Sequence, residues 1–575
     1  MSDLSELYDD PVFRPGDPAS AARVAALRAA AQVEVEPTSI VAYRSAGHVL
    51  IIGSELDGLE CADALREHLH CTVVATVAAS GVLTDTAARA RDDDARVLLL
   101  RGEPCKITGH LGHFAMNLRL PGGEEISPAA LTRPQQPFFD LVLDLRREPG
   151  IRFELPPFGY YAPAGDAERL HRMLGEIPDM TGEFEKPRFF NYNPDICAHG
   201  DSGLTGCTRC LDACPTGAIR SIGDLVDIDP YLCQGAGTCT SVCPTGAMTY
   251  AYPGPRDQIV RVKRMLAAYR DAGGESPVLM FHDEEAGLER LRALAPAMPA
   301  RVLPVQVGEI GAVGMDTWLA ALAYGAAQVA LLDTDAVPPT VRAAMQAQLD
   351  YVRPMLDAMG LDGRRVSWVD TDADVPTLFA AAREPAVAKP ATFDTFNEKR
   401  GSLRLALEHL YAQAPERPQV AALPAGAPFG QVHVDRKACT LCMSCPQVCP
   451  TRALSDAGDK PELSFTEDLC VQCGLCEKAC PEDAITLEPR YVFDWDVRRK
   501  PRVLNEEEPF CCIKCGKPFA TQSVIGRMVD KLSGHHMFQS ADALNRLKMC
   551  GDCRVVDMFA EDLKGGSKPR WLGPK

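Results

Sequence analysis

The chain has 575 residues, a length that predicts several domains rather than one. Its 78 acidic and 60 basic residues give a formal net charge of −18, and no basic run lies near its cysteine motifs, so no nucleic acid is expected as a partner. Most of the 23 cysteines stand at metal-binding spacings and the N-terminus has no apolar leader, so we expect a reducing, cytoplasmic location. The longest apolar run, 318–332, is short for a membrane span, and none is expected.

Residues 1–45 are expected to form an N-terminal helical segment, and residues 46–185 a Rossmann-like α/β domain. The run HVLIIG at the start of this domain has the apolar character of a buried strand. Gly53 and Gly58 follow it, but Glu55 stands where the dinucleotide fingerprint G-x-G-x-x-G has its middle glycine. Because a carboxylate there opposes the pyrophosphate, we expect a Rossmann-like turn that has lost its NAD or flavin site.

Residues 186–256 contain two cysteine runs that each end in Cys-Pro. Nine residues follow the first cysteine of the first run, where two are usual, and Ala236 replaces one cysteine of the second run. Both runs otherwise follow the C-x2-C-x2-C-x3-C-P spacing of bacterial two-cluster ferredoxins, which predicts a first ferredoxin-like module. TGAI or TGAM follows each Cys-Pro, so an alanine and an aliphatic residue are expected to line a small core. The cysteines are Cys197, Cys207, Cys210 and Cys214, then Cys233, Cys239 and Cys243.

In this spacing, the fourth cysteine of each run binds the cluster of the other run. The first module is therefore expected to hold one [4Fe–4S] cluster on Cys197, Cys207, Cys210 and Cys243. Its other site has three thiolates, which suit a [3Fe–4S] cluster or a [4Fe–4S] cluster with a labile fourth iron: Cys214, Cys233 and Cys239. Water, hydroxide or a side chain such as His199 would complete the labile form. The alternative is a degenerate half that binds nothing.

Residues 257–375 alternate between helical and strand patterns and predict a second α/β domain. Residues 376–430 contain two Pro/Ala-rich segments around an amphipathic helix at 398–412. We expect this region to be a linker with a helix that docks one ferredoxin module on the scaffold.

Residues 431–490 carry the ferredoxin spacing twice without interruption, as CTLCMSCPQVCP and CVQCGLCEKACP. The interlocking rule predicts one [4Fe–4S] cluster on Cys439, Cys442, Cys445 and Cys480. It predicts a second on Cys470, Cys473, Cys476 and Cys449. The short spacing is expected to leave no room for a regular helix through the ligands. A pair of structural zinc sites is the alternative, but zinc gives no reason for the interlocked repeat.

Residues 491–575 contain two C-x2-C knuckles, and Gly516 directly after the first knuckle suits the tight turn around a thiolate. Paired knuckles are typical of a zinc ribbon, although the gap between these two is unusually long. We predict that zinc binds to Cys512, Cys515, Cys550 and Cys553. A fifth iron–sulfur cluster, with Cys511 as a spare ligand, is the alternative.

The predicted fold is an α/β multidomain protein with two ferredoxin-like (α+β) modules among α/β layers and a C-terminal zinc-ribbon-like element. The modules resemble bacterial two-cluster ferredoxins. The order of a Rossmann-like turn, GHLGHF and a cysteine module is similar to the A subunits of heterodisulfide reductases. The run VLPVQVGEIGAVGMDTWLAALAYGAAQVALL resembles the delta subunit of methyl-viologen-reducing hydrogenases, without its cysteines. The whole layout resembles the multi-cluster ferredoxins that accompany molybdenum formate dehydrogenases.

Fifteen cluster-type cysteines without a substrate-activating motif predict an electron-transfer protein with no catalytic residue of its own. The resemblances imply a redox enzyme complex as partner, of the formate dehydrogenase type first, then of the hydrogenase or heterodisulfide reductase type. A flavin- or NAD(P)-dependent oxidoreductase subunit is one alternative. A scaffold whose small domains are stapled by clusters is another.

Overall fold

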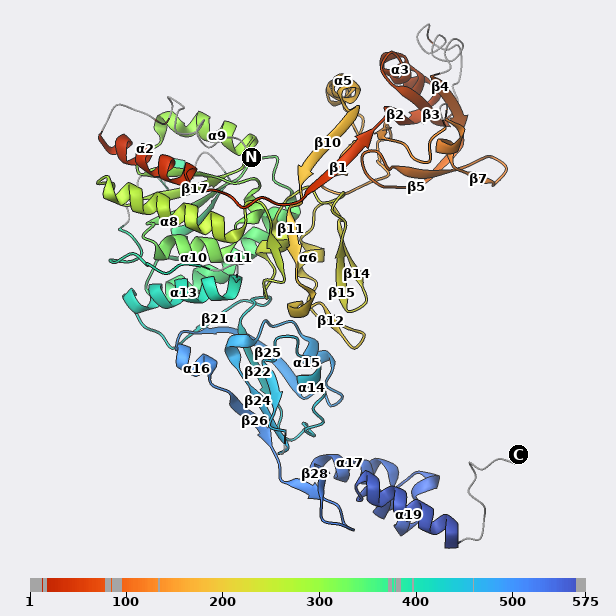
Figure 1. Cartoon of the computed structure of the whole chain (residues 1–575), viewed down its shortest axis with the longest axis vertical. Coiled ribbons are helices and arrows are strands. Elements are labelled where there is room, and N and C mark those ends of the chain that lie inside the picture. Colours follow the sequence, from red (N-terminus) through yellow and green to blue (C-terminus); the bar gives the residue numbers. More distant parts are fainter. Residues whose placement is uncertain are drawn as a thin grey trace.

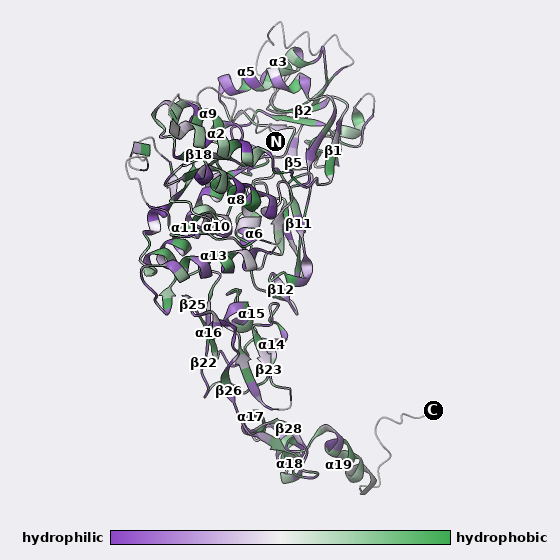
Figure 2. Cartoon of the chain, turned by 60° about the vertical axis from the view of Figure 1, so that its left-hand side comes forward, coloured by the Kyte–Doolittle hydropathy of each residue, from purple (hydrophilic) through white to green (hydrophobic). Residues whose placement is uncertain are grey.

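The structure, a computed structural model, describes residues 13, 18–77, 84, 96–132, 135–370, 375–376, 378, 384–395, 398–458 and 460–564. Its units follow one another along an elongated molecule, and Figures 1 and 2 show this order from two directions. The first α/β unit occupies one end, and below it the second α/β unit and the first cysteine module lie beside each other (Figure 1). The second cysteine module follows, and the C-terminal helices form the other end. Within the described part of the chain, no helix has the length and apolar character needed to cross a bilayer.

The first α/β unit is built on a five-stranded parallel sheet. Its elements are β2 (His48–Ser54), α3 (Glu55–Leu65), β3 (His70–Val77), β4 (Val97–Arg101), β5 (Glu103–Thr108), β6 (Ala115–Arg119), β7 (Glu125–Ile126), β8 (Leu141–Asp144), β9 (Tyr160–Tyr161) and α5 (Ala167–Glu176). The sheet has the order β4-β3-β2-β8-β9, and β5, β6 and β7 form a separate antiparallel sheet. The HVLIIG run is the buried central strand β2, as predicted. A Cβ on Gly58 would lie 2.6 Å from Val73 Cγ1, so this glycine lets α3 pack closely on β3.

The N-terminal segment connects the two α/β units. β1 (Ile40–Ser45) pairs with β10 (Gly182–Pro187) as an antiparallel ribbon beside the first unit. The predicted N-terminal helix is α2 (Pro18–Ala31), and it packs on α8 (Pro255–Asp271) of the second unit. Alanines at helical spacing are buried along α2, and their small side chains let the two helices approach: Ala22, Ala26 and Ala30.

The second α/β unit has a four-stranded parallel sheet in the order β18-β17-β19-β20. Its further elements are β17 (Val278–His282), α9 (Ala286–Leu294), β18 (Val302–Gln306), α10 (Met315–Ala323), β19 (Gln328–Leu332), α11 (Pro339–Ala358) and β20 (Val366–Val369). Every residue of α10 and β19 is buried, so the apolar run 318–332 belongs to the core of this unit. α13 (Lys399–Gln413) is the helix predicted at 398–412, and it packs on α10.

The two cysteine modules share one plan, in which four-residue helices carry the third position of each cysteine run. The first module contains β11 (Phe190–Tyr192), β12 (Gly200–Asp201), β13 (Leu204–Thr205), α6 (Arg209–Asp212), β14 (Ile219–Ile222), β15 (Leu225–Ile228), α7 (Thr238–Ser241) and β16 (Met248–Tyr250). The second contains β21 (Val420–Ala422), β22 (Gly430–Val434), α14 (Ser444–Gln447), β23 (Leu454–Asp456), β24 (Glu462–Phe465), α15 (Leu475–Lys478), β25 (Ile485–Val492), α16 (Trp495–Arg499) and β26 (Arg502–Glu506). The expectation that no helix passes through the ligands was wrong for these single turns. Left-handed residues directly before α7, α14 and α15 make room for them.

The C-terminal unit consists of β27 (Pro509–Cys511), β28 (Pro518–Thr521), α17 (Gln522–Leu532), α18 (Ala541–Leu547) and α19 (Gly551–Lys564). The first cysteine knuckle lies in the hairpin between β27 and β28. The second lies between α18 and the start of α19, so a helix rather than a second hairpin carries it. β26 pairs with β24, and the sheet of the second module therefore extends beyond residue 490.

Candidate metal centres

Two small cavities lie inside the second module, and cysteines line both of them. One cavity is lined by Cys439, Cys442, Cys445 and Cys480. The other is lined by Cys449, Cys470, Cys473 and Cys476. The last cysteine of each run thus lies in the cavity of the other run, and the spacing predicts these same two ligand sets.

Left-handed residues between the cysteines wrap the ligand loops around the cavities. They are Leu441 and Met443 in one run and Gln472 and Gly474 in the other, at matching positions. In the first module, Gly235 and Gly237 also have positive φ angles. They flank Ala236 in the way that Gln472 and Gly474 flank Cys473. The backbone therefore places Ala236 where the other runs have a cysteine.

The predicted small core lies beneath the cysteines of both modules. The alanine and the aliphatic residue that follow each Cys-Pro are all buried: Ala218, Ile219, Ala247, Met248, Ala453, Leu454, Ala484 and Ile485. This confirms the small core expected from TGAI and TGAM in the first module, and it shows that the second module buries the same positions, in TRAL and EDAI.

The chemistry of the donors fits iron–sulfur clusters in the second module. Burial raises the pKa of the Cys445 thiol to about 12, and the nearby Cys439 and Cys442 contribute to the same shift. Burial likewise raises the pKa of Cys473 to about 11. Thiols gathered in a buried cavity oppose one another's ionisation, so a cationic centre is needed to hold all four as thiolates. Thiolates within an apolar shell are the ligands that iron–sulfur clusters use.

The cysteines of the first module form two groups. Burial raises the pKa of Cys210 to about 12, and the charges that act on it are those of Cys207, Cys243 and Cys197. Burial also raises the pKa of Cys239, and the charges that act on it most strongly are those of Cys233 and Cys214. The spacing assigns the same cysteines to a four-ligand and a three-ligand site, and this assignment stays a prediction.

His199 is not placed to complete the three-cysteine site, because both of its ring nitrogens are engaged elsewhere. Nδ1 lies 2.9 Å from the carbonyl oxygen of Cys207, and Nε2 lies 2.8 Å from Ser221 Oγ. Lys186 of β10 lies beside that site instead, where its Nζ donates a hydrogen bond of 2.6 Å to the carbonyl of Cys233. Burial lowers the pKa of Lys186 to about 8. Sequence reasoning missed Lys186, because no local pattern connects it with the cysteine runs.

The two modules touch beside their ligand loops. Lys478 of α15 donates a hydrogen bond to the carbonyl of Thr205, two residues before Cys207. Leu475 packs on Gly206, where an added Cβ would lie 2.6 Å from Leu475 Cγ. The charge of Cys207 also contributes to the raised pKa of Cys473. The four-cysteine site of the first module therefore adjoins the second module.

The first residues of α13 hold both modules. Lys399 Nζ donates hydrogen bonds to the carbonyls of Thr240 (3.0 Å) and Ser241 in the first module. Arg400 donates to the carbonyl of Pro244 (3.4 Å) and, across the junction, to that of Cys470 (3.3 Å). The helix expected to dock one module thus contacts two. Sequence reasoning missed these residues, although two cations at a helix N-terminus oppose the macrodipole and indicate a special contact.

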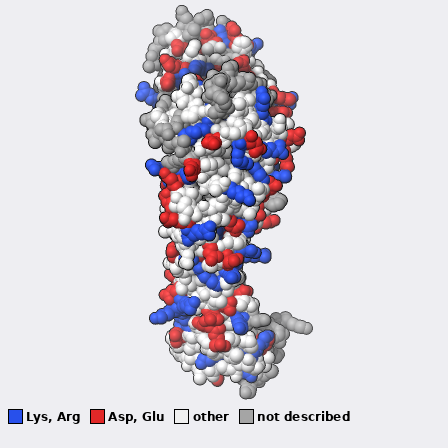
Figure 3. All heavy atoms as spheres, turned by 90° about the vertical axis from the view of Figure 1, so that its left-hand side faces the viewer, with Lys and Arg blue, Asp and Glu red and all other residues white. Residues whose placement is uncertain are grey.

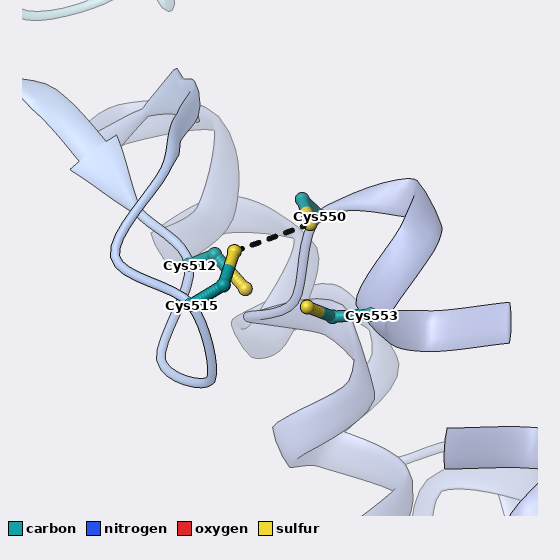
Figure 4. A group of neighbouring side chains, drawn as sticks. All are labelled: Cys512, Cys515, Cys550 and Cys553. Atoms are coloured by element: carbon teal, nitrogen blue, oxygen red, sulfur yellow. Dashed lines mark hydrogen bonds between the residues drawn. The ribbon is translucent and has the colours of Figure 1, made fainter. Parts of the chain in front are cut away.

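Four cysteines of the C-terminal unit point toward one another from the hairpin and from α19, and together they form the C-terminal cysteine group (Figure 4). The sulfurs of Cys512, Cys515, Cys550 and Cys553 all lie within 4.8 Å of one another. Cys515 Sγ and Cys550 Sγ are 3.7 Å apart. Tetrahedral zinc with Zn–S bonds of about 2.3 Å separates its sulfurs by about 3.8 Å, so the group fits a single ion. Among the described residues, no other group of three or more metal-binding side chains comes this close together.

The surroundings of the C-terminal cysteine group favour a thiolate at Cys512, whereas hydrogen bonds with Cys515 and Cys550 raise the pKa of Cys553 to about 12. Desolvation raises the pKa of Cys512, but backbone N–H groups of Cys550, Cys515 and Lys514 outweigh it and lower that pKa to about 6. The unit is fixed to the second module, because Thr521 Oγ1 donates to the carbonyl of Thr440 (2.9 Å). Arg527 Nη2 adds a hydrogen bond to the carbonyl of Ala438 (2.7 Å), next to Cys439.

Comparisons with known proteins match both modules. The family described as 4Fe-4S binding domain matches residues 463–486, and the 4Fe-4S dicluster domain family matches residues 205–247. An uncharacterized ferredoxin of Methanocaldococcus jannaschii is 38% identical over 48 residues, which are 8% of this chain and 76% of that protein. The chain belongs to the 4Fe–4S ferredoxin family. This ferredoxin is mixed helix and strand throughout and carries more than one cluster-type module.

Two relatives of this ferredoxin have names that describe subunits. The NADH-quinone oxidoreductase subunit I 2 of Geobacter metallireducens is 30% identical over 99 residues, 15% of this chain and 76% of that protein. The pyruvate synthase subunit PorD of Thermotoga maritima is 36% identical over 58 residues, 10% of this chain and 58% of that protein. The ferredoxin spans about half the length of some relatives, namely 58% of PorD and 43% of a second M. jannaschii ferredoxin.

Proposed function

We propose that this ferredoxin is an electron-transfer subunit whose cysteine sites form one continuous series. The three-cysteine site adjoins the four-cysteine site of the first module, since Cys239 has Cys210 and Cys243 as further charged neighbours. That site adjoins the second module at Lys478, and Cys476 lies near Cys445 of the next site. Iron–sulfur clusters bound at these sites would each accept and release one electron with little change in geometry. The continuity of the series is the observation that supports this function.

Three [4Fe–4S] clusters and one further cluster are proposed for the series. The ligand sets of the three are Cys197, Cys207, Cys210 and Cys243; Cys449, Cys470, Cys473 and Cys476; and Cys439, Cys442, Cys445 and Cys480. The further cluster, a [3Fe–4S] or labile [4Fe–4S] form, is assigned to Cys214, Cys233 and Cys239. For the C-terminal cysteine group we propose zinc rather than a fifth cluster, because its sulfurs are too close together to surround several irons.

Residues around the sites are suited to tune reduction potentials. Hydrogen bonds reach ligand sulfurs from Met248 N to Cys243 (3.4 Å), from Ala484 N to Cys480 (3.3 Å) and from Gln472 Nε2 to Cys470 (3.3 Å). Donors aimed at a sulfur stabilise added negative charge and raise the potential. The ammonium of Lys186, beside Cys233, and the guanidinium of Arg400, beside Cys470, should also raise the reduction potential of the adjacent cluster.

We infer that the partner is a redox enzyme complex in a reducing, cytoplasmic compartment. The subunit names of two relatives support this class of partner. A formate dehydrogenase is the first candidate, and a complex of the hydrogenase or heterodisulfide reductase type is the second. The face shown in Figure 3 mixes acidic and basic side chains, so the net charge of −18 is not concentrated there.

The C-terminal unit is the proposed contact surface for that partner. α19 exposes four apolar side chains, each between 43% and 61% exposed: Val555, Val556, Met558 and Phe559. Exposed apolar side chains that cluster on one helix indicate a surface that a partner covers. Zinc at the C-terminal cysteine group would hold this helix against the hairpin without taking up an electron, because Zn²⁺ is redox-inert.

The nucleotide-dependent alternative is disfavoured at the first α/β unit. The Glu55 carboxylate is buried and accepts two hydrogen bonds from Arg101, at 3.0 and 2.8 Å. This pair lies at the N-terminus of α3, where a Rossmann fold binds the pyrophosphate of its dinucleotide.

Iron analysis and reduction of the anaerobically purified protein test the proposal. We expect about fifteen or sixteen irons per chain, no stoichiometric flavin, and bleaching by dithionite but not by NADH or NADPH. Stoichiometric flavin, or direct bleaching by a nicotinamide nucleotide, would favour the enzyme alternative. Clusters that neither dithionite nor a co-purified complex can reduce would favour the scaffold.

A further inference from the structure

A cavity of about 480 Å³ is lined by residues of the first module, α11, α13 and the start of the second module. Ligand pockets for small organic molecules occupy about 300–1,000 Å³, so this cavity has the size of a binding site. It is distinct from the small cysteine-lined cavities of the second module. Of the proposed cluster ligands Cys243 alone lines it, and the Rossmann-like turn contributes no residue to it.

Three cations line this cavity: Arg209, Lys399 and Arg400. The side chain of Arg209 makes no hydrogen bond or ion pair with any residue that the structure describes. Lys399 and Arg400 donate only to backbone carbonyls, and no described carboxylate pairs with either. Asp316 and Asp468 act on them only through space. The cavity therefore has an excess of positive charge, with Asp212 as the one acidic residue among those that line it.

The remaining walls are mostly apolar. One face of α11 contributes Thr340, Ala344, Ala347 and Tyr351, which share a helical stripe. Phe429 also lines the cavity, and the guanidinium of Arg400 lies 5.5 Å from its ring centre. Small alanines leave space in the cavity, and the rings of Tyr351 and Phe429 suit contact with an aromatic body.

We propose that this cavity binds a small organic anion, one with an aromatic body and a phosphate or carboxylate group. The aromatic body would lie against the alanine stripe of α11, and the anionic group would pair with Arg209 and Lys399. Cations without a carboxylate partner in the cavity wall favour an anionic ligand there, in addition to the nearby thiolates of Cys207, Cys243 and Cys470. Cys243 also lines the cavity, so the ligand would lie beside a proposed cluster ligand. The binding itself does not depend on the electron-transfer proposal.

Titration calorimetry with a matched pair of probes tests this site on the anaerobically purified full chain. The probes are 1-naphthyl phosphate and 1-naphthol, which share the aromatic body and differ in the anionic group. We expect the phosphate to bind at one site per chain, at least tenfold more tightly than the naphthol. The Arg209→Gln variant should lose most of this preference for the phosphate. The Arg270→Gln variant removes an exposed cation elsewhere and should keep it.

Filling the cavity gives a second test that leaves the ligand loops alone. Ala347→Phe should abolish binding of both probes, while iron content and the visible spectrum of each variant stay those of the parent protein. Equal binding of the two probes, no binding of either, or binding that survives Ala347→Phe would overturn the proposal. None of these outcomes changes the iron content or the reduction by dithionite, so the two proposals fail independently.

Discussion

Lys478 Nζ lies 2.5 Å from the carbonyl oxygen of Thr205, and this hydrogen bond joins the two ferredoxin modules beside their ligand loops. Lys478 follows Cys476 by two residues, and Thr205 precedes Cys207 by two. Gly206 completes the contact, because a methyl group there would lie 2.6 Å from Leu475 Cγ and 2.8 Å from the carbonyl oxygen of Ala198. The proximity of the two sites therefore depends on a position that only glycine fits.

The Gly206→Val variant should separate the modules. Overpacking of a tight contact costs about 1–3 kcal/mol, and here the side chain meets backbone that cannot move aside easily. We expect weaker magnetic interaction between clusters in the EPR spectrum of the reduced protein, with unchanged iron content. Gly122→Val is the matched control, since nothing lies within 4 Å of an added Cβ in that turn. An unchanged spectrum in Gly206→Val would show that the modules do not depend on this contact.

The two groups of cysteines that line the cavities of the second module were predictable because the spacing itself carries the information. Four cysteines within eleven residues can reach one centre only in few ways, and Pro450 and Pro481 turn the fourth cysteine of each run away. The HVLIIG strand and α13 were predictable for a similar reason, since periodicity is local. Contacts such as Lys186 with Cys233, or α2 with α8, join segments far apart in sequence and leave no local pattern.

The C-terminal cysteine group should hold one zinc per chain. Cys553→Ser removes one thiolate from a set whose sulfurs lie within 4.8 Å, and we expect loss of most of the zinc. Cys511→Ser is the control, because Cys511 is exposed, adjoins Cys512 and lies outside the group. Elemental analysis measures both variants beside the parent. If the loss of Cys553 lowers the iron and sulfide content instead of zinc, the group holds a fifth cluster.

The three-cysteine site should accept a fourth ligand at position 236. Ala236 is buried between Gly235 and Gly237, whose backbone matches that around Cys473. Ala236→Cys should convert the site to a stable [4Fe–4S] form and remove a three-iron signal from the low-temperature EPR spectrum of the oxidised protein. Ala218→Cys, at a buried core position of the same module, should leave the spectrum unchanged. The same spectrum in parent and Ala236→Cys would count against the assignment.

The second α/β unit should lose stability in mild acid because of His282. Burial lowers the pKa of this side chain to about 4, although its hydrogen bond with the carbonyl of Asp283 opposes the shift. In the unfolded chain the pKa is about 6.5, so protons favour the unfolded state as the pH falls from about 6.5 toward 4. The stabilising contribution is thus present above pH 6.5 and lost below it.

Between about pH 7.5 and 5.5, protonation of His282 in the unfolded state should lower the free energy of unfolding of this unit by about 1 kcal/mol. Hydrogen exchange of the β17 amides, corrected for the intrinsic exchange rate at each pH, measures the change. The His282→Gln side chain cannot titrate, so this variant should lose most of the pH dependence. For each protein, the change in stability is measured relative to its own value at pH 7.5. A slope that persists in the variant would assign the effect to other groups.

The ion pair at the start of α3 should be required for stability rather than for nucleotide binding. Glu55 is almost fully buried, whereas half of the Arg101 side chain is exposed, so removing Arg101 leaves an uncompensated carboxylate inside the protein. We expect Arg101→Gln to cost about 1–3 kcal/mol in denaturant unfolding of the first α/β unit. The Glu55→Gln/Arg101→Gln double variant should cost less than Arg101→Gln alone, because it removes the buried charge as well. Neither the parent nor any variant should bind NADH in a fluorescence titration, and saturable binding by the parent would show that the Glu55 carboxylate does not exclude the dinucleotide.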